Sequence, residues 1–198
     1  MPDEQVSDHI LTLPNLISFA RLLGVGVFWW LILVEENIAL AAVFIIVIGT
    51  TDWIDGYLAR KLNQVSSLGK ALDPIADWLM IGSAVIGGMI VGVVPLVIGI
   101  TLITREVFMG AVTLLVLVKG AGTLEVRYLG KVATFIIYGA IPAFYLASAG
   151  FLEPIMTAIG WVGGVVGLVL YWYVAFQYVG DARLVLAEVE SASSLEES

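Results

Sequence analysis

The chain contains no cysteine and one histidine, and only nine of its 198 residues are Lys or Arg. The absence of cysteine excludes disulfide bonds and thiol chemistry. His9 stands alone in an acidic leader, so the sequence does not indicate a histidine-based catalytic or metal site. Seventeen Asp and Glu residues outnumber the basic ones. That acidic balance argues against a nucleic-acid partner.

Charge of either sign is also scarce, because only 13% of the residues are charged and 60% are hydrophobic. A composition this apolar indicates that the lipid bilayer is the solvent. Residues 1–13 carry acids and no Lys or Arg, which is the wrong charge for a secretory signal. We expect them to form an N-terminal cytoplasmic leader. We expect residues 184–198, rich in Glu and Ser, to form an acidic, disordered tail.

Between these ends, the pattern of uncharged runs and breakers predicts an all-α integral membrane protein. Residues 14–183 would form a single domain of about six transmembrane helices. The uncharged stretch 37–51 is too short to span by itself, since a spanning helix needs about 20 residues, so the second span must include the acidic residues that follow. The expected spans are roughly 14–34, 37 into the acidic segment, 69–91, 95–118, 128–148 and 154 to beyond 178.

The few basic residues orient these spans. The turns near 35–36, 92–95 and 150–153 contain no Lys or Arg. Basic residues prefer cytoplasmic loops, so both termini are predicted to be cytoplasmic in a multi-pass protein of the cell membrane. Arg21 and Arg105 lie within spans, and the remaining basic residues share the cytoplasmic side: Arg60, Lys61, Lys70, Lys119, Arg127, Lys131 and Arg183.

The most informative feature is a cluster of acids at the ends of two apolar segments. Asp52 and Asp55 are three residues apart, and Asp73 and Asp77 are four apart, so each pair shares a face if its segment is helical. Carboxylates brought that close repel one another unless a positive charge lies between them. Hard divalent cations such as Mg²⁺, which also bind phosphates, are the usual solution.

Their depth in the membrane indicates a cavity. At about 1.5 Å per residue, Asp52 and Asp77 lie roughly 20 Å from the outer turns, in the cytoplasmic third of a core about 30 Å thick. Polar groups at that depth are tolerated around a water-filled cavity. We therefore expect an active site that opens to the cytoplasm and to lipid.

The spacing of this segment, D-x2-D-G-x2-A-R-x8-G-x3-D-x3-D, resembles the signature of the CDP-alcohol phosphotransferase family at every position. The resemblance implies a CDP-linked lipid donor, usually CDP-diacylglycerol, an alcohol acceptor, and CMP as the leaving group. It implies that Mg²⁺ or Mn²⁺, as two ions, is held by Asp52, Asp55, Asp73 and Asp77. Asp77 is also the candidate general base for the acceptor hydroxyl.

The same resemblance assigns the residues between the acids. Gly56, Ala59 and Gly69 correspond to positions that line the cytidine pocket. Arg60 corresponds to a partner for phosphate or for the motif acids. The alternative, in which the acids only cap helices or pair with neighbouring Arg and Lys, does not account for four acids at this spacing.

Arg105, Arg127 and Lys131 are the spare basic residues that could bind an acceptor phosphate. Arg105 lies inside the fourth span, where a charged residue is functional by default. Its neighbour Glu106 offers the alternative of a structural ion pair. Arg127 and Lys131 open the fifth span, and their alternative is ordinary positive-inside anchoring.

Several segments resemble phosphatidylglycerophosphate synthases, namely residues 13–21, 104–106 and 129–134, although Trp78 stands where that branch often has Lys. The favoured acceptor is therefore glycerol 3-phosphate. The alternatives are phosphatidylglycerol, as in a cardiolipin synthase, and then an inositol phosphate. A divalent-cation transporter is a different class, but its acids would be spread through the membrane rather than clustered on one side. A homodimer is a candidate assembly.

Overall fold

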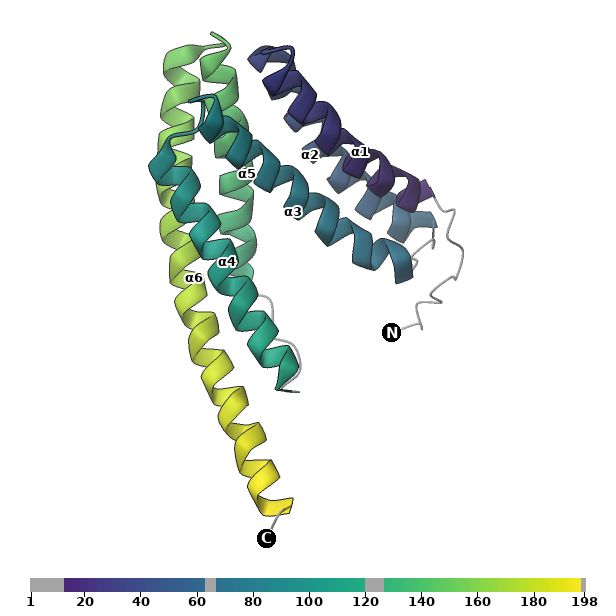
Figure 1. Ribbon diagram of the computed structural model, residues 1–198, viewed down its shortest axis with the longest axis vertical. Coiled ribbons are helices and arrows are strands. Elements are labelled where there is room, and N and C mark those ends of the chain that lie inside the picture. Colours follow the sequence, from purple (N-terminus) through teal and green to yellow (C-terminus); the bar gives the residue numbers. More distant parts are fainter. Residues whose placement is uncertain (1–12, 63–66, 120–126, 197–198) are drawn as a thin grey trace. The chain divides into compact units, whose positions relative to one another are not determined.

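The structure is a computed structural model of the chain. It describes residues 13–62, 67–119 and 127–196, with side chains described for 16–51, 75–119 and 127–187. The described residues form helices and turns, with no strand among them (Figure 1). The helices are α1 (Leu13–Leu33), α2 (Ile38–Leu62), α3 (Ser67–Ile90), α4 (Leu96–Val118), α5 (Tyr128–Ser148) and α6 (Glu153–Glu196).

The all-α prediction is confirmed, and five of the six helices begin and end within a few residues of the expected spans. The turns use the expected breakers. Gly92 and Gly150 have φ of 76° and 79°, a backbone conformation that glycine adopts without steric cost. The chain divides into two compact units, one comprising Met1–Pro95 and Ile141–Gly160 and the other Leu96–Ala140 and Trp161–Ser198.

In the first unit, α1 packs against both α2 and α3. Small residues permit the close approach that transmembrane helices need. Gly24 faces the ring of Phe44, and Gly87 faces the ring of Phe28. The indole of Trp29 donates a hydrogen bond to the Ser83 hydroxyl at 3.1 Å. The first contact joins α1 to α2, and the other two join α1 to α3.

Gly88 closes the end of α3. Its carbonyl accepts hydrogen bonds from the N–H groups of Val93 and Val94 at 2.7 and 2.9 Å. A Cβ at this position would lie 2.4 Å from the Val94 side chain and 2.9 Å from the Tyr145 hydroxyl. Any larger residue at Gly88 would therefore have to push apart the turn or the buried tyrosine. At Gly26 and Gly82, by contrast, an added Cβ would meet no atom within 4 Å, so these glycines are not required by close packing.

In the second unit, α5 and α6 pack antiparallel in a constant register. Glycines on α6 sit where α5 side chains approach most closely, and polar contacts continue the same register toward the start of α5. The successive pairs are Ala140 with Gly163, Ile137 with Gly167, Thr134 with Tyr171, Gly130 with Val174 and Arg127 with Tyr178.

The helices α4 and α6 run parallel in this unit, as Figure 1 also shows. Ile98 meets Gly164, Arg105 meets Tyr171, and the rings of Phe108 and Trp172 stack with centroids 6.0 Å apart. Later residues of α4 therefore contact later residues of α6. This register places Arg105 beside Tyr171.

The last helix is much longer than a bilayer requires. At 1.5 Å per residue, the 44 residues of α6 extend about 66 Å, roughly twice the hydrocarbon thickness. The helix reaches into residues 184–198, for which the composition predicts disorder. Leu184, Leu186, Ala187 and Glu188 are good helix formers, and a helix already nucleated by α6 can continue through them.

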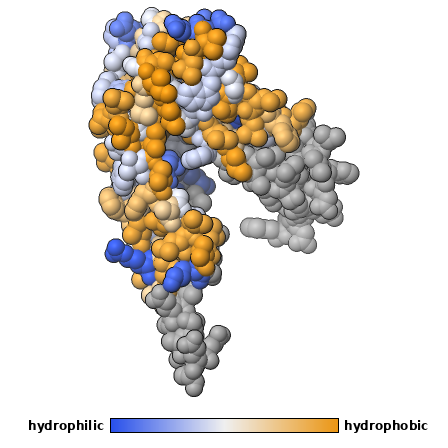
Figure 2. Space-filling model, in the orientation of Figure 1, coloured by the Kyte–Doolittle hydropathy of each residue, from blue (hydrophilic) through white to orange (hydrophobic). Residues whose placement is uncertain are grey.

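Four helical segments are long and apolar enough to cross a membrane, among the residues that the structure describes: Leu16–Leu33, Leu96–Val118, Tyr128–Ser148 and Glu153–Ala187. In α2 and α3, the apolar residues whose side chains are described are Ile38–Thr51 and Ile75–Ile90. Figure 2 shows apolar residues along the helices and hydrophilic residues mainly toward their ends.

Candidate active site

Asp77 on α3 is the signature acid whose side chain the structure describes. Its Oδ1 accepts a hydrogen bond from Nη1 of Arg21 on α1 at 2.6 Å. The Arg21 side chain is 1% exposed and that of Asp77 is 29% exposed. Burial of a guanidinium between apolar helices costs free energy unless an acid pairs with it. The ion pair with Asp77 therefore offsets the charges of both side chains.

Arg21 was not predicted as a site residue. Ser18, one turn earlier on α1, is also fully buried. The two polar residues share a face of α1 in a helix that otherwise consists mostly of apolar residues. The signal was present in the sequence, because a charged residue inside a membrane span is functional by default. What the sequence did not reveal was its partner, 56 positions away.

The other signature residues are positioned by their helices alone. Asp52, Asp55, Gly56, Ala59 and Arg60 lie in the last turns of α2, and Gly69 and Asp73 lie in the first turns of α3. The backbone is helical at these positions, as the predicted i,i+3 and i,i+4 spacings require. Their side chains are outside the described part of the structure, so their roles stay predictions.

The donor chemistry fits a hard divalent cation. The signature supplies carboxylate oxygens and neither His nor Cys, which is the ligand type of Mg²⁺ and Mn²⁺. Asp77 is the signature carboxylate whose side chain is described, and it forms an ion pair with the guanidinium of Arg21. Residues 16–51, 75–119 and 127–187 contain no other group of acids or histidines that could hold a metal ion.

The second unit holds the three basic residues predicted to bind the acceptor. Arg105 is 9% exposed, its guanidinium carbon lies 3.9 Å from the centre of the Tyr171 ring, and its Nη1 donates to Glu106 at 2.9 Å. The Tyr171 hydroxyl shares a 3.0 Å hydrogen bond with Thr134 on α5. The ring of Tyr171 therefore holds a buried cation on one side of the α5–α6 contact. The ion pair with Glu106, left open by the sequence, is present.

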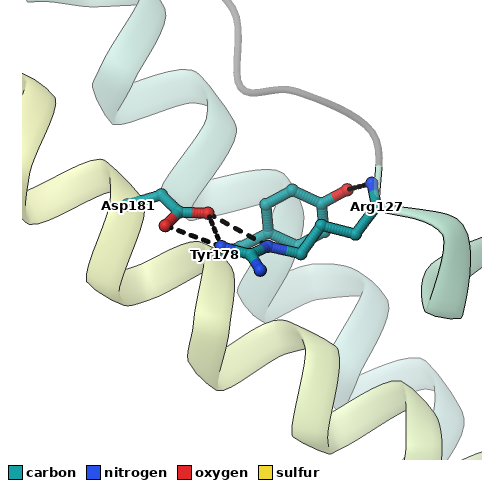
Figure 3. Close-up of polar contacts among 3 residues, drawn as sticks. All are labelled: Arg127, Tyr178 and Asp181. Atoms are coloured by element: carbon teal, nitrogen blue, oxygen red, sulfur yellow. Dashed lines mark hydrogen bonds and ion pairs between the residues drawn. The ribbon is translucent and has the colours of Figure 1, made fainter.

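Arg127 precedes α5 and is held by α6 at two points (Figure 3). Its guanidinium donates hydrogen bonds to both carboxylate oxygens of Asp181, at 2.7 to 3.2 Å. Its backbone N–H donates to the Tyr178 hydroxyl at 3.0 Å. Hydrogen bonding to Asp181 holds the pKa of the Arg127 guanidinium above its ordinary value, so it stays charged.

Lys131, one turn after Arg127, is exposed and has no ion pair with any residue that the structure describes. The prediction that all three basic residues are spare was therefore wrong for two of them. Arg105 and Arg127 each have an acidic partner. Glu106 is the sequence neighbour of Arg105 and was named as its possible partner, whereas Asp181 lies on α6, and helical periodicity does not show which acid a neighbouring helix presents.

Comparison with known proteins decides the family. The profile of the CDP-alcohol phosphatidyltransferase family matches residues 11–177. The chain belongs to this family.

Two kinds of relatives share this CDP-alcohol phosphatidyltransferase domain. The CMP-forming cardiolipin synthase of Streptomyces coelicolor is 37% identical, covering 92% of this chain and 88% of its own. The CDP-diacylglycerol–glycerol-3-phosphate 3-phosphatidyltransferase of Bacillus subtilis is 38% identical, covering 72% of this chain and 80% of its own. The protein of that same name from Rickettsia felis is 33% identical, covering 83% and 87%.

As a CDP-alcohol phosphatidyltransferase, the protein is a transferase of phospholipid synthesis, and its family substrates are CDP-diacylglycerol and an alcohol. The family generally depends on divalent metal ions. Its four apolar helices agree with a membrane protein. The expectation drawn from the spacing of the signature acids is thus confirmed for the family and the reaction type.

Proposed function

We propose that the protein transfers a phosphatidyl group from CDP-diacylglycerol to the hydroxyl of a glycerol-based acceptor that carries a phosphate. The acceptor oxygen bonds to the phosphorus that bears the diacylglycerol. The bond from that phosphorus to the CMP oxygen breaks, CMP departs with that oxygen, and the hydroxyl proton passes to a base. The observation that carries the proposal is Asp77, a signature carboxylate held by a buried arginine between two apolar helices.

Asp52, Asp55, Asp73 and Asp77 are the proposed ligands for two Mg²⁺ or Mn²⁺ ions. When bound, such ions neutralise the charge of the pyrophosphate and of departing CMP. Asp77 is the proposed base, because its carboxylate is partly exposed while its neighbour Arg21 is not. Arg21 holds Oδ1, which restricts the rotation of the carboxylate. Such restriction favours a fixed geometry between base and acceptor hydroxyl.

Gly56, Ala59 and Gly69 are the proposed lining of the cytidine pocket, with Arg60 as a partner for phosphate or for the acids. Glycine lets a ligand approach the backbone closely. Arg105, Arg127 and Lys131 are the proposed acceptor-phosphate residues. The register of α5 and α6 supports their grouping, since Tyr171 at Arg105 and Tyr178 at Arg127 are about 10 Å apart along α6.

Glycerol 3-phosphate and phosphatidylglycerol are the two acceptors to be distinguished, because relatives of both kinds match this chain. The test uses purified protein, labelled CDP-diacylglycerol and Mg²⁺, with each acceptor and an inositol phosphate offered separately. We expect CMP release with one glycerol-based acceptor, and none after EDTA treatment. Full activity in EDTA, or CMP release only with inositol phosphate, would overturn the proposal.

The active site is proposed to face the cytoplasm, with both termini on that side, because the basic residues gather there. The chain is free of cysteine, so Ser191→Cys supplies a unique label site. An impermeant thiol reagent should label this variant only after the membrane is opened. Labelling of intact cells would reverse the orientation.

A further inference from the structure

The acceptor residues carry their own counter-charges. Arg105 pairs with Glu106 and Arg127 pairs with Asp181, while Lys131 is unpaired among the described residues. Among the described side chains of this group, three positive charges are therefore offset by two negative ones. Their net charge is +1, whereas the three basic residues alone would supply +3.

The two pairs differ in how easily a ligand could reach them. Arg105 is buried beneath Tyr171 beside Glu106. Arg127 and Asp181 are 41% and 37% exposed. An exposed ion pair contributes little to folding stability, because water and salt screen the two charges. The Tyr178 hydroxyl also binds the Arg127 backbone N–H, so the start of α5 is tied to α6 without Asp181 (Figure 3).

Asp181 lies far enough along α6 to reach the second polar boundary of a bilayer whose first boundary is at the start of the helix. Measured from the turn before Glu153, it is about 42 Å along α6 at 1.5 Å per residue. A bilayer including its headgroups is about 40–45 Å thick. A bilayer whose outer boundary lies at Glu153 would therefore have its inner polar boundary near Asp181, at the level of the phosphate of a lipid acceptor.

The candidate acceptors differ in the charge of that phosphate. A phosphomonoester such as glycerol 3-phosphate loses its second proton with a pKa of about 6 and is mostly a dianion at pH 7. A phosphodiester such as phosphatidylglycerol has one ionisable proton and is a monoanion. A site with one excess positive charge matches the monoanion and undercompensates the dianion.

We propose that Asp181 is a specificity-determining residue that, by pairing with Arg127, favours a phosphodiester acceptor over a phosphomonoester acceptor. The inference rests on the proposed phosphatidyl transfer and deepens it by naming the charge class of the acceptor. Asp181 offsets the single positive charge of the Arg127 guanidinium. Without Asp181, that charge would be fully available to a dianionic phosphate. The phosphodiester needs less charge and is bound by Lys131 with the remaining donors of Arg127.

The test measures kcat/KM of the wild-type protein and of Asp181→Asn with glycerol 3-phosphate and with short-chain phosphatidylglycerol. The wild type should prefer phosphatidylglycerol. Asp181→Asn keeps the size of the side chain and removes its charge. It should shift the ratio toward glycerol 3-phosphate by roughly tenfold, mainly through a lower KM for that acceptor, with the donor KM unchanged.

Three further variants serve as controls for this measurement. Asp181→Ser removes the same charge with a smaller side chain and repeats the measurement if the Asn variant fails to fold. Asp181→Glu keeps the charge and should keep the wild-type preference. Glu153→Gln, at the opposite end of α6, makes the same change of charge away from the acceptor residues and should leave the ratio unchanged.

The outcomes separate the inference from the proposed function. An unchanged ratio in both neutral variants, or a wild-type preference for glycerol 3-phosphate, overturns the role of Asp181 and leaves phosphatidyl transfer intact. A wild-type protein that releases CMP with neither acceptor overturns the proposed function itself. An equal shift in Glu153→Gln would show a general effect of net charge and would also overturn the inference.

Discussion

Two arginine–aspartate pairs of nearly equal length occupy very different surroundings. Arg21 and Asp77 lie 2.6 Å apart in the first unit, with the guanidinium fully buried. Arg127 and Asp181 lie 2.7 Å apart in the second, with both side chains about two-fifths exposed. Distance alone would rank them equally. Their burial distinguishes their contributions to stability. Breaking a buried pair leaves a charge without a partner in an apolar environment, whereas water and salt ions solvate the charges of a broken exposed pair.

The comparison indicates different uses. The Arg21–Asp77 pair orients a carboxylate that the proposed chemistry needs in one geometry. In the proposed role of Asp181, Arg127 remains paired with this acid and offers its remaining donors to the acceptor phosphate. Under these proposals, one pair orients a reactive group, and the other sets the charge available to a substrate.

The largest effect is expected from Asp77→Asn. The variant loses both the proposed base and a metal ligand, so CMP release should fall by at least about a thousandfold. Glu153→Gln makes the same acid-to-amide change at the far turn and should retain wild-type turnover. Normal turnover with weakened binding of CDP-diacylglycerol in Asp77→Asn would instead assign Asp77 to ligation alone.

Removal of the buried cation should be the next largest effect. Arg21→Met takes the guanidinium away from Asp77 and should lower the free energy of unfolding by about 3 kcal/mol, in the lower part of the range for buried pairs because Asp77 is partly exposed. Unfolding by SDS in mixed micelles would measure this loss. The double variant Arg21→Met with Asp77→Asn should recover part of the stability and none of the activity. A double variant no more stable than the single one would show that the pair is not the cause.

Arg105→Ala should affect the acceptor rather than the donor. The buried guanidinium, held by Tyr171 and Glu106, supplies fixed donors to the proposed acceptor phosphate. Its loss should raise the acceptor KM by about 10- to 100-fold, with the KM for CDP-diacylglycerol little changed. Lys131→Ala should have a smaller effect, since lysine acts as a point charge. Arg183→Ala, at an exposed position on α6, serves as the control. An equal rise in both KM values would contradict the assignment.

The smallest effect sharpens the comparison directly. Arg127→Gln breaks the exposed pair but retains the backbone bond to Tyr178, so the free energy of unfolding should change much less than in Arg21→Met. The same SDS titration compares the two variants. If the two substitutions destabilise the protein equally, burial does not distinguish the pairs.

Much of this architecture follows from the sequence. Long uncharged runs end at charged or glycine-containing turns, so the pattern of residues alone bounds the helices from Leu13 to Ser148 closely. It does not bound the far end of α6, because Glu and Ser suggest a solvated tail although the intervening Leu and Ala residues prolong a helix. The signature from Asp52 to Asp77 identified the family and reaction type, since its chemistry depends on local spacing.

The sequence by itself determined which segments are helices, that a bilayer surrounds them, and which reaction the acidic signature belongs to. Tertiary structure alone decided the charge pairing: Arg21 with Asp77, and Arg127 with Asp181. Each pair joins segments more than fifty positions apart in the chain. The physical reason is that helical periodicity determines the face on which a residue lies, whereas packing determines the residue opposite it. The proposed roles of Arg21 and Arg127 therefore depend on partners that only the packing reveals.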